Sequence, residues 1–204
     1  MPGSTAAAAG SQNEGLIDSI GDDIREIRRL AAESNLKRPV ITVKDGLTSW
    51  DTAFLGEFLP IIRHAFSNIV DHGFVRPLSK GRITADRPFE ISIKASLLDT
   101  QTLEILIDDT GAGFHAPDIE SVAKKQGVKD PQKLPRNELL AVLLNDGAST
   151  ADAVSETSGR GVGLSAIAAF AREKKGIIEL LDNPETVGAR IRIRFNKKAT
   201  NFGA

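Results

Sequence analysis

The sequence predicts an α/β two-layer sandwich, in which helices cover one face of a mostly antiparallel, mixed sheet of about five strands. The first observation behind this fold is the order of the predicted elements: helix, strand, helix, hairpin, irregular segment, helix and two strands. This order lacks the strand-helix-strand alternation of a parallel sheet. The second observation is that the hairpin strands alternate apolar and polar residues, so one face of the sheet should meet water.

The N-terminal region is expected to hold a helix and a short strand. Residues 1–14 are small and polar, which predicts a flexible segment. From Leu16 to Ala32, apolar residues recur every three or four positions, so residues 15–37 should form an amphipathic helix and a link. This helix packs either on its own domain or on a partner, as in a homodimer. The β-branched run Pro39–Lys44 predicts a strand that ends at the Asp45-Gly46 turn.

A long helix should follow from about Thr52 to Asp71, with Gly73 ending it in a left-handed conformation. Phe89–Leu97 and Leu103–Ile107 alternate at period two and predict an antiparallel hairpin.

The segment Gly111–Ser158 is rich in Gly, Pro, Lys and Asp and is expected to be mobile. Two helical pieces are predicted within it, near Ile119–Lys125 and Arg136–Leu144. The last predicted elements are a helix from Gly161 through Ala171 and strands at Gly176–Leu181 and Gly188–Phe195.

Composition narrows the function classes. With 26 basic and 27 acidic residues, the net charge is −1, so no overall field attracts nucleic acid or a membrane surface. The absence of cysteine excludes disulfides, thiolate zinc sites and a cysteine nucleophile. The N-terminus is too short for a membrane span and lacks a basic signal region, which predicts a cytoplasmic protein without membrane insertion. The row Arg190, Arg192 and Arg194 fits cross-strand charge pairs better than a nucleic-acid surface, because no aromatic residues interleave it.

The first candidate site motif lies on the long helix. His64, Asn68 and His72 are four residues apart and form a polar ridge beside the apolar stripe. An asparagine carbonyl that faces a cleft suits Mg²⁺, which takes few protein ligands and bridges to phosphate oxygens. A helix end with satisfied surface polar groups explains the pattern equally well.

The second motif is Asp109–Gly113, directly after a buried strand. The Asp109 carboxylate can only accept hydrogen bonds, and Gly111 and Gly113 let the backbone approach a flat ligand. Such a carboxylate can accept from the exocyclic amine of adenine, whereas guanine presents an acceptor there. The alternative is an ordinary turn that leaves a strand.

The third motif is Ser158–Leu164, at the start of a helix. Its glycines would expose N–H groups to a phosphate, assisted by the helix dipole. The spacing matches neither GxxxxGK[ST] nor GxGxxG. A flexible hinge is the alternative.

Together and in this order, the motifs resemble one family. The stretch from about Arg38 to Phe195 resembles the ATPase domain of the CheA-type chemotaxis histidine kinases, which has the Bergerat fold and belongs to the wider group of histidine kinases, gyrase B, Hsp90 and MutL. The resemblance rests on HAFSNIVDHG at 64–73, DTGAG at 109–113, Ser149-Thr150-Ala151, and SGRGVG at 158–163. It implies an ATPase domain at 38–198, an ATP lid at about 114–158, and a C-terminal tail at 199–204.

The resemblance also implies a role for each motif residue. Asn68 would coordinate Mg²⁺ and act in catalysis with His64, and Asp109 would recognise adenine. The remaining contacts to ATP would come from Asp71, His72, Gly111, Gly113, Ser149, Thr150, Ser158, Gly159, Arg160, Gly161, Val162 and Gly163.

The implied activity is transfer of the ATP γ-phosphate to a histidine. The chain has only three histidines, and two of them belong to the implied nucleotide pocket. The expected partner is therefore a separate histidine-containing phosphotransfer domain or protein, followed by a response regulator. Two other functions stay open. An anti-sigma-factor-like serine kinase or binding protein has this fold, although such proteins usually carry Glu where His64 stands. A nucleotide-binding pseudokinase also fits, because Ser67 and Ala148 replace the family's usual Arg and Phe.

Overall fold

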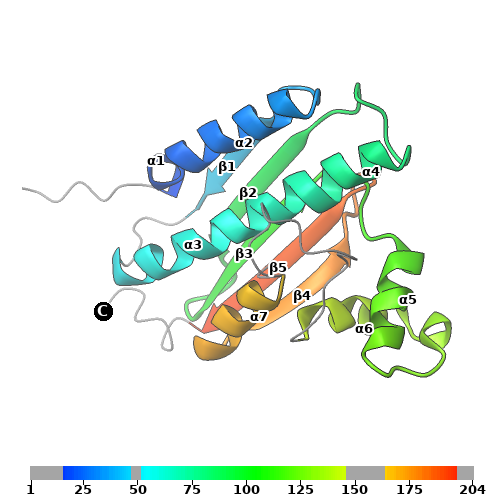
Figure 1. The fold of residues 1–204 in the computed structure, drawn as a ribbon. Helices are drawn as coiled ribbons and strands as arrows, with labels where there is room; N and C mark the ends of the chain where they lie inside the picture. Colours follow the sequence, from blue (N-terminus) through cyan, green and yellow to red (C-terminus); the bar gives the residue numbers. More distant parts are fainter. Residues whose placement is uncertain (1–15, 47–51, 146–163, 197–204) are drawn as a thin grey trace, which may run out of the picture.

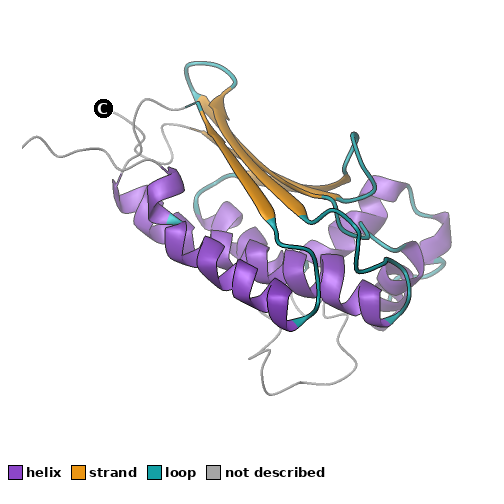
Figure 2. Ribbon diagram, turned by 90° about the horizontal axis from the view of Figure 1, so that it is seen from above, coloured by secondary structure: helices purple, strands orange, loops and turns teal. Residues whose placement is uncertain are grey.

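The chain folds as a two-layer α/β sandwich, as predicted. The computed structural model describes residues 16–46, 52–145 and 164–196 (Figure 1). Five strands form one sheet in the order β1-β2-β3-β5-β4. Strand β1 pairs with β2 in parallel and every other pair is antiparallel, so the sheet is mixed. Figure 2 shows the described helices on one face of this sheet, with the other face uncovered.

The N-terminal helix packs against its own domain. It is divided into α1 (Leu16–Ser19) and α2 (Gly21–Glu33). Its apolar stripe is buried: Leu16 and Ile20 are fully covered and Ile27 is 3% exposed. Helix α2 lies beside α3, and Arg63 Nε donates to Asp23 Oδ1 at 2.7 Å across that seam (Figure 1). Homodimer formation through this helix stays a prediction.

The long helix continues further than the sequence predicted. It comprises α3 (Thr52–Asn68), the π-helix η1 (Ile69–Val75) and α4 (Arg76–Ser79). The prediction that Gly73 ends the helix is wrong, because Gly73 lies inside η1 and does not adopt a positive φ. Phe74 stacks on Phe89 with ring centroids 3.8 Å apart, and this packing carries the helix past the glycine. The left-handed glycine after the helical run is Gly81, at φ 65°.

The strands agree with the predicted pattern. They are β1 (Val40–Asp45), β2 (Glu90–Leu97), β3 (Thr102–Asp109), β4 (Ile177–Asp182) and β5 (Ala189–Asn196). The β2–β3 hairpin is confirmed, and its inward side chains join the core. The uncovered face carries cross-strand ion pairs, as predicted for its arginines: Arg190 with Asp108, Arg192 with Glu179, and Arg194 with Glu104.

Packed helices occupy the first part of the segment that was expected to be mobile. They are α5 (Ala116–Lys125), the 3₁₀ turns η2 (Pro131–Lys133) and η3 (Val142–Leu144), and α6 (Arg136–Ala141). Buried Ile119, Val122 and Leu140 join the main core, so this part is built into the domain. Helix α7 (Leu164–Glu173) follows, with Phe170 packed on Phe195 of β5. Among the described helices, none combines the length and apolar character needed to cross a bilayer.

Candidate functional site

Asp109, at the end of β3, is a buried carboxylate held by backbone amides. Its residue is 4% exposed, and its Oδ1 accepts from the Gly111 amide at 2.7 Å and from the Ala189 amide at 3.4 Å. Burial raises the pKa of Asp109 from 3.8 to about 6, against the opposing effect of these two hydrogen bonds. Both amides donate to Oδ1, so Oδ2 is the oxygen available to a ligand.

Gly111 lets the turn after Asp109 touch the long helix. A Cβ at Gly111 would lie 2.6 Å from the carbonyl oxygen of Gly73 and 2.9 Å from Asp109 Oδ1. The Ala112 amide donates to that same Gly73 carbonyl at 2.9 Å. Any side chain at Gly111 would therefore push the two segments apart. The first and second sequence motifs, predicted to share a pocket, are in direct contact here.

The loop between β4 and β5 closes on the turn from the other side. A Cβ at Gly188 would lie 1.9 Å from the Asp109 carbonyl oxygen, so only glycine fits. Asn183 Nδ2 donates to that carbonyl at 3.0 Å. Gly113 adopts a φ of 69°, and a Cβ there would lie 3.1 Å from the Gly188 carbonyl oxygen. No motif marks this loop in the sequence. The signal that could have been used is Gly188 itself, the first residue of the predicted strand, because a strand glycine often marks a close backbone approach.

Asn68 is the last residue of α3, at the junction with the π-helix η1. Its amide Nδ2 is buried without a hydrogen-bond partner in the part of the chain that the structure describes. Five residues separate Asn68 from Gly73, which corresponds to about 7 Å along a helix axis. A π-helix pairs residues five apart, so η1 aligns Asn68 with Gly73 more closely than an α-helix would. Asn68 thus precedes, on one continuous helical run, the Gly73 carbonyl that binds the Asp109 turn.

The chemistry of Asn68 fits a magnesium ligand. Amide oxygens are among the hard donors that Mg²⁺ prefers. A buried amide that has an unsatisfied polar atom is costly unless a ligand or water completes it. Rotating the amide by half a turn would present the oxygen in the direction of the present nitrogen.

The other charged residues of this helix lie around the π-helical turn. Asp71 accepts from Arg76, with Oδ1 to Nε at 3.0 Å and Oδ2 to the guanidinium at 2.7 Å. His72 keeps 44% of its side chain exposed, with Nε2 3.7 Å from Asp71 Oδ2. Burial, followed by the positive charge of Arg76, lowers the pKa of His72, so its ring is neutral at pH 7. His64 is half-buried, one turn before Asn68.

The structure therefore brings together part of the predicted site. Asp109 and Gly111 contact Gly73 of the helical run that carries Asn68, Asp71 and His72. Gly113 contacts Gly188 of the β4–β5 loop. The remaining predicted residues lie outside the described part of the chain: Ser149, Thr150, Ser158, Gly159, Arg160, Gly161, Val162 and Gly163.

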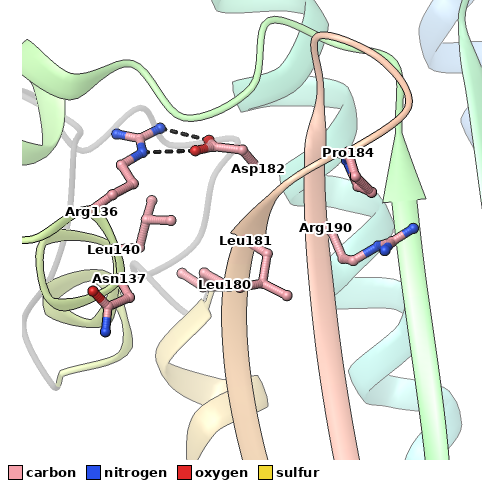
Figure 3. A pocket seen from close by; sticks show the side chains of 8 residues that line it. All are labelled: Arg136, Asn137, Leu140, Leu180, Leu181, Asp182, Pro184 and Arg190. Atoms are coloured by element: carbon pink, nitrogen blue, oxygen red, sulfur yellow. Dashed lines mark hydrogen bonds and ion pairs between the residues drawn. The ribbon is translucent and has the colours of Figure 1, made fainter.

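A groove of about 410 Å³ lies between α6 and the edge strand β4, apart from these residues (Figure 3). Arg136 spans it and donates to both carboxylate oxygens of Asp182, at 2.9 and 2.7 Å. Leu140, Leu180 and Leu181 form its apolar wall. Neither Asp109 nor Asn68 lines this groove, so it is not the site that the motifs predict.

Comparison with known proteins agrees with the fold and with the motifs. The family model of histidine kinase-, DNA gyrase B- and HSP90-like ATPases matches residues 58–199. The chemotaxis protein CheA of Bacillus subtilis is 31% identical over 149 residues, which are 70% of this chain and 21% of that protein. CheA of Halobacterium salinarum is 29% identical over 151 residues, 72% of this chain and 22% of that protein. The chain thus spans about a fifth of the length of these relatives.

Two solved structures share the fold at lower identity. Full-length ShkA in complex with AMPPNP has a TM-score of 0.57 at 14% identity, and the match covers 93% of this chain and 32% of ShkA. The histidine kinase domain of a blue-light-activated kinase from Erythrobacter litoralis has a TM-score of 0.51 at 11% identity, covering 96% of this chain and 68% of that one. At these identities the two structures support the fold alone.

Proposed function

Because this chain belongs to the family of histidine kinase-, DNA gyrase B- and HSP90-like ATPases, with the CheA kinases among its relatives, we propose that it binds Mg-ATP and donates the γ-phosphate to a histidine on another domain or protein. The observation that carries this proposal is the contact between the Asp109 turn and the Asn68 helix. It joins the turn that carries the buried Asp109 carboxylate to the helical run that carries Asn68, which supports a shared site for a purine and a metal.

Asp109 is the residue that selects adenine in this proposal. Its Oδ1 is occupied by two backbone amides, so Oδ2 accepts from the exocyclic amine of adenine. Guanine presents an oxygen at that position, and two acceptors would face each other in a buried site. We therefore expect a strong preference for ATP over GTP.

The helix around Asn68 holds the phosphate end. Mg²⁺ bound with the nucleotide would neutralise part of the phosphate charge. The Asn68 amide oxygen would hold that ion, and His72, whose ring is neutral, would line the phosphates beside Asp71. His64, one helical turn before Asn68, would orient the acceptor histidine. The resemblance implies an ATP lid at about 114–158 that would exclude water. Helices α5 and α6, in the first part of this range, pack into the core, so they would not move with such a lid.

The acceptor is proposed to be a histidine of a phosphotransfer domain or protein, which then passes the phosphoryl group to a response regulator. A neutral imidazole, with a pKa near ~6.5, already has a free electron pair at pH 7. The N–P bond forms as the bond from the γ-phosphorus to the β–γ bridging oxygen breaks. ADP then leaves with that electron pair, and the ring N–H proton passes to solvent.

Two measurements test this function. ATP and GTP are titrated against the purified chain, and γ-labelled ATP is then offered with histidine-containing phosphotransfer domains. Asn68→Ala should abolish transfer, whereas the control Gln101→Ala, exposed in the β2–β3 turn at the end of the hairpin opposite to Asp109, should transfer normally. Tight ATP binding without transfer to any histidine domain would instead indicate the pseudokinase. Label on a serine of a partner would indicate the anti-sigma-factor type.

A further inference from the structure

We propose that Arg87 is a positioning residue of the purine end of the site, and that together with Asn183 it clasps the turn after Asp109 so that the carboxylate faces the base. The inference rests on the proposed function, which makes Asp109 the residue that reads adenine. Neither Arg87 nor Asn183 belongs to a motif that the sequence reveals.

Arg87 makes its contacts with backbone carbonyls of the turn. Its Nε donates to the carbonyl of Thr110 at 2.6 Å, and its terminal nitrogen donates to the carbonyl of Gly111 at 3.0 Å. The same terminal nitrogen also donates to the carbonyl of Val187 in the β4–β5 loop. One planar guanidinium thus ties together two segments that are 76 residues apart in sequence.

Asn183 completes the clasp from the β4–β5 loop. Its Nδ2 donates to the carbonyl of Asp109 at 3.0 Å, and its Oδ1 accepts from the Glu185 amide at 2.9 Å, which fixes its own orientation. Thr110 adds a third tie, because its hydroxyl donates to the Pro88 carbonyl at 2.7 Å and accepts from the Glu90 amide at 3.0 Å. The turn is thereby fixed to the segment before β2 and to the loop before β5.

The charge of Arg87 gives the clasp a second effect. Within the described part of the chain, no carboxylate forms an ion pair with Arg87, and its charge is instead felt by Asp109. Burial raises the pKa of Asp109 and the Gly111 and Ala189 amides lower it, while the charge of Arg87 adds a smaller lowering effect that opposes the negative charge of Asp108. Arg87 therefore both orients the carboxylate and favours its ionised, accepting form.

The test separates the purine end from the phosphate end. Dissociation constants of the whole chain are measured by calorimetry for ATP, adenosine and magnesium tripolyphosphate, between pH 5 and 8. Arg87→Ala should weaken ATP and adenosine binding by about tenfold and leave tripolyphosphate binding within about twofold. Its ATP affinity should also begin to fall at a higher pH. Arg87→Lys keeps the positive charge but lacks the planar guanidinium with its paired donors. This variant should bind ATP more weakly than wild type, while the pH at which its ATP affinity begins to fall should stay unchanged.

The matched control is Arg82→Ala, which removes a nearby arginine that pairs with Asp118 and does not touch the turn. Its nucleotide binding should be unchanged. If Arg87→Ala does not fold, Asn183→Ala removes two neutral hydrogen bonds, of which only the one to the Asp109 carbonyl touches the turn. This variant should weaken ATP binding about threefold and leave tripolyphosphate binding unaffected.

The outcomes are distinguishable. One outcome would overturn the role of Arg87 alone: the wild-type chain binds ATP, Asp109→Asn does not, and the Arg87 and Asn183 variants bind ATP normally. The proposed function would then stand. If Arg87→Ala lost affinity for adenosine and for tripolyphosphate to the same extent, Arg87 would have only a general structural role, and the inference would be overturned. A wild-type chain that binds no ATP would overturn the proposed function first.

Discussion

The proposed purine end, around Asp109, and the proposed metal end, around Asn68, are built differently. The turn after Asp109 is fixed from three directions: by the Gly73 carbonyl, by Arg87, and by the β4–β5 loop with Asn183. Asn68 stands on a single helix, its amide nitrogen has no described partner, and the neighbouring Asp71–Arg76 pair is about a third exposed. In the proposed function, base recognition by Asp109 would therefore be preorganised, whereas the ligand would complete the metal end at Asn68.

The π-helix belongs to both ends. It begins directly after Asn68 and contains Gly73, whose carbonyl binds the Asp109 turn. A π-helical turn is less favourable than an α-helical one and occurs frequently at functional sites. Here the stacking of Phe74 on Phe89 and the contact of Gly73 with Gly111 retain it. In the proposed function, this turn would bring the metal ligand Asn68 and the Gly73 contact with the Asp109 turn toward the same side of the helix.

The largest expected effect follows from filling the closest contact of the purine end. Gly188→Ala would put a Cβ 1.9 Å from the Asp109 carbonyl oxygen, so the β4–β5 loop must move. ATP affinity should fall by at least ~100-fold, and the free energy of unfolding by roughly 3 kcal/mol. Denaturant unfolding and ATP titration measure the two effects.

The matched control is Gly56→Ala, where a Cβ would have no neighbour within 4 Å. Gly56 lies in α3 on an exposed surface, so alanine should stabilise the chain by about 0.5–1 kcal/mol and leave ATP binding unchanged. Similar behaviour of the two variants would mean that the purine end is not held as tightly as the contacts indicate.

Asp109→Asn should have opposite effects on binding and on stability. The amide replaces the accepting Oδ2 by a donor, so ATP affinity should fall by about 100-fold. Burial raises the pKa of Asp109 to about 6, so the fold favours its protonated form. The stability from this group is present below pH 4 and is lost as the pH rises through about 6. At pH 7, asparagine should therefore stabilise the chain by up to about 3 kcal/mol.

Asp108→Asn is the control for that variant. Asp108 lies one residue earlier on β3, faces the uncovered side of the sheet and pairs with Arg190. Its replacement should destabilise the chain slightly and leave ATP binding intact. Thermal unfolding of both variants at pH 5 and pH 7 checks the sign, because the gain from Asp109→Asn should shrink at the lower pH.

Lowering the pH should weaken the purine end alone. Protonation of Asp109, whose pKa is about 6, places a donor opposite the adenine amine. ATP affinity should therefore fall by about tenfold between pH 7 and pH 5. Tripolyphosphate is the reference ligand because it titrates in the same range as the phosphates of ATP. A constant ratio of the two affinities across this range would contradict a carboxylate that reads the base.

Local pattern was sufficient to predict the layers, because alternation in β2 and β3 and the helical stripe of α3 each reflect one buried face. The roles of the motif residues stay predictions. The π-helix was not predictable in this way. The wider turn of the π-helix depends on the contacts of Phe74 with Phe89 and of Gly73 with the Asp109 turn, and these partners are distant in sequence. Arg87 and Asn183 were missed for the same reason, since their partners are carbonyl oxygens that any residue can supply.

The smallest effect is expected at the metal end. Arg76→Ala removes the ion pair with Asp71, whose side chains are 30% and 35% exposed, so water and salt screen it. The variant should lose less than about 1 kcal/mol in its free energy of unfolding and bind ATP within about threefold of wild type. The difference in ATP affinity between variant and wild type should vanish at 1 M salt. ATP titration at two salt concentrations measures this. A tenfold loss that persists in high salt would show that the metal end is as firmly preset as the purine end, and the contrast between them would disappear.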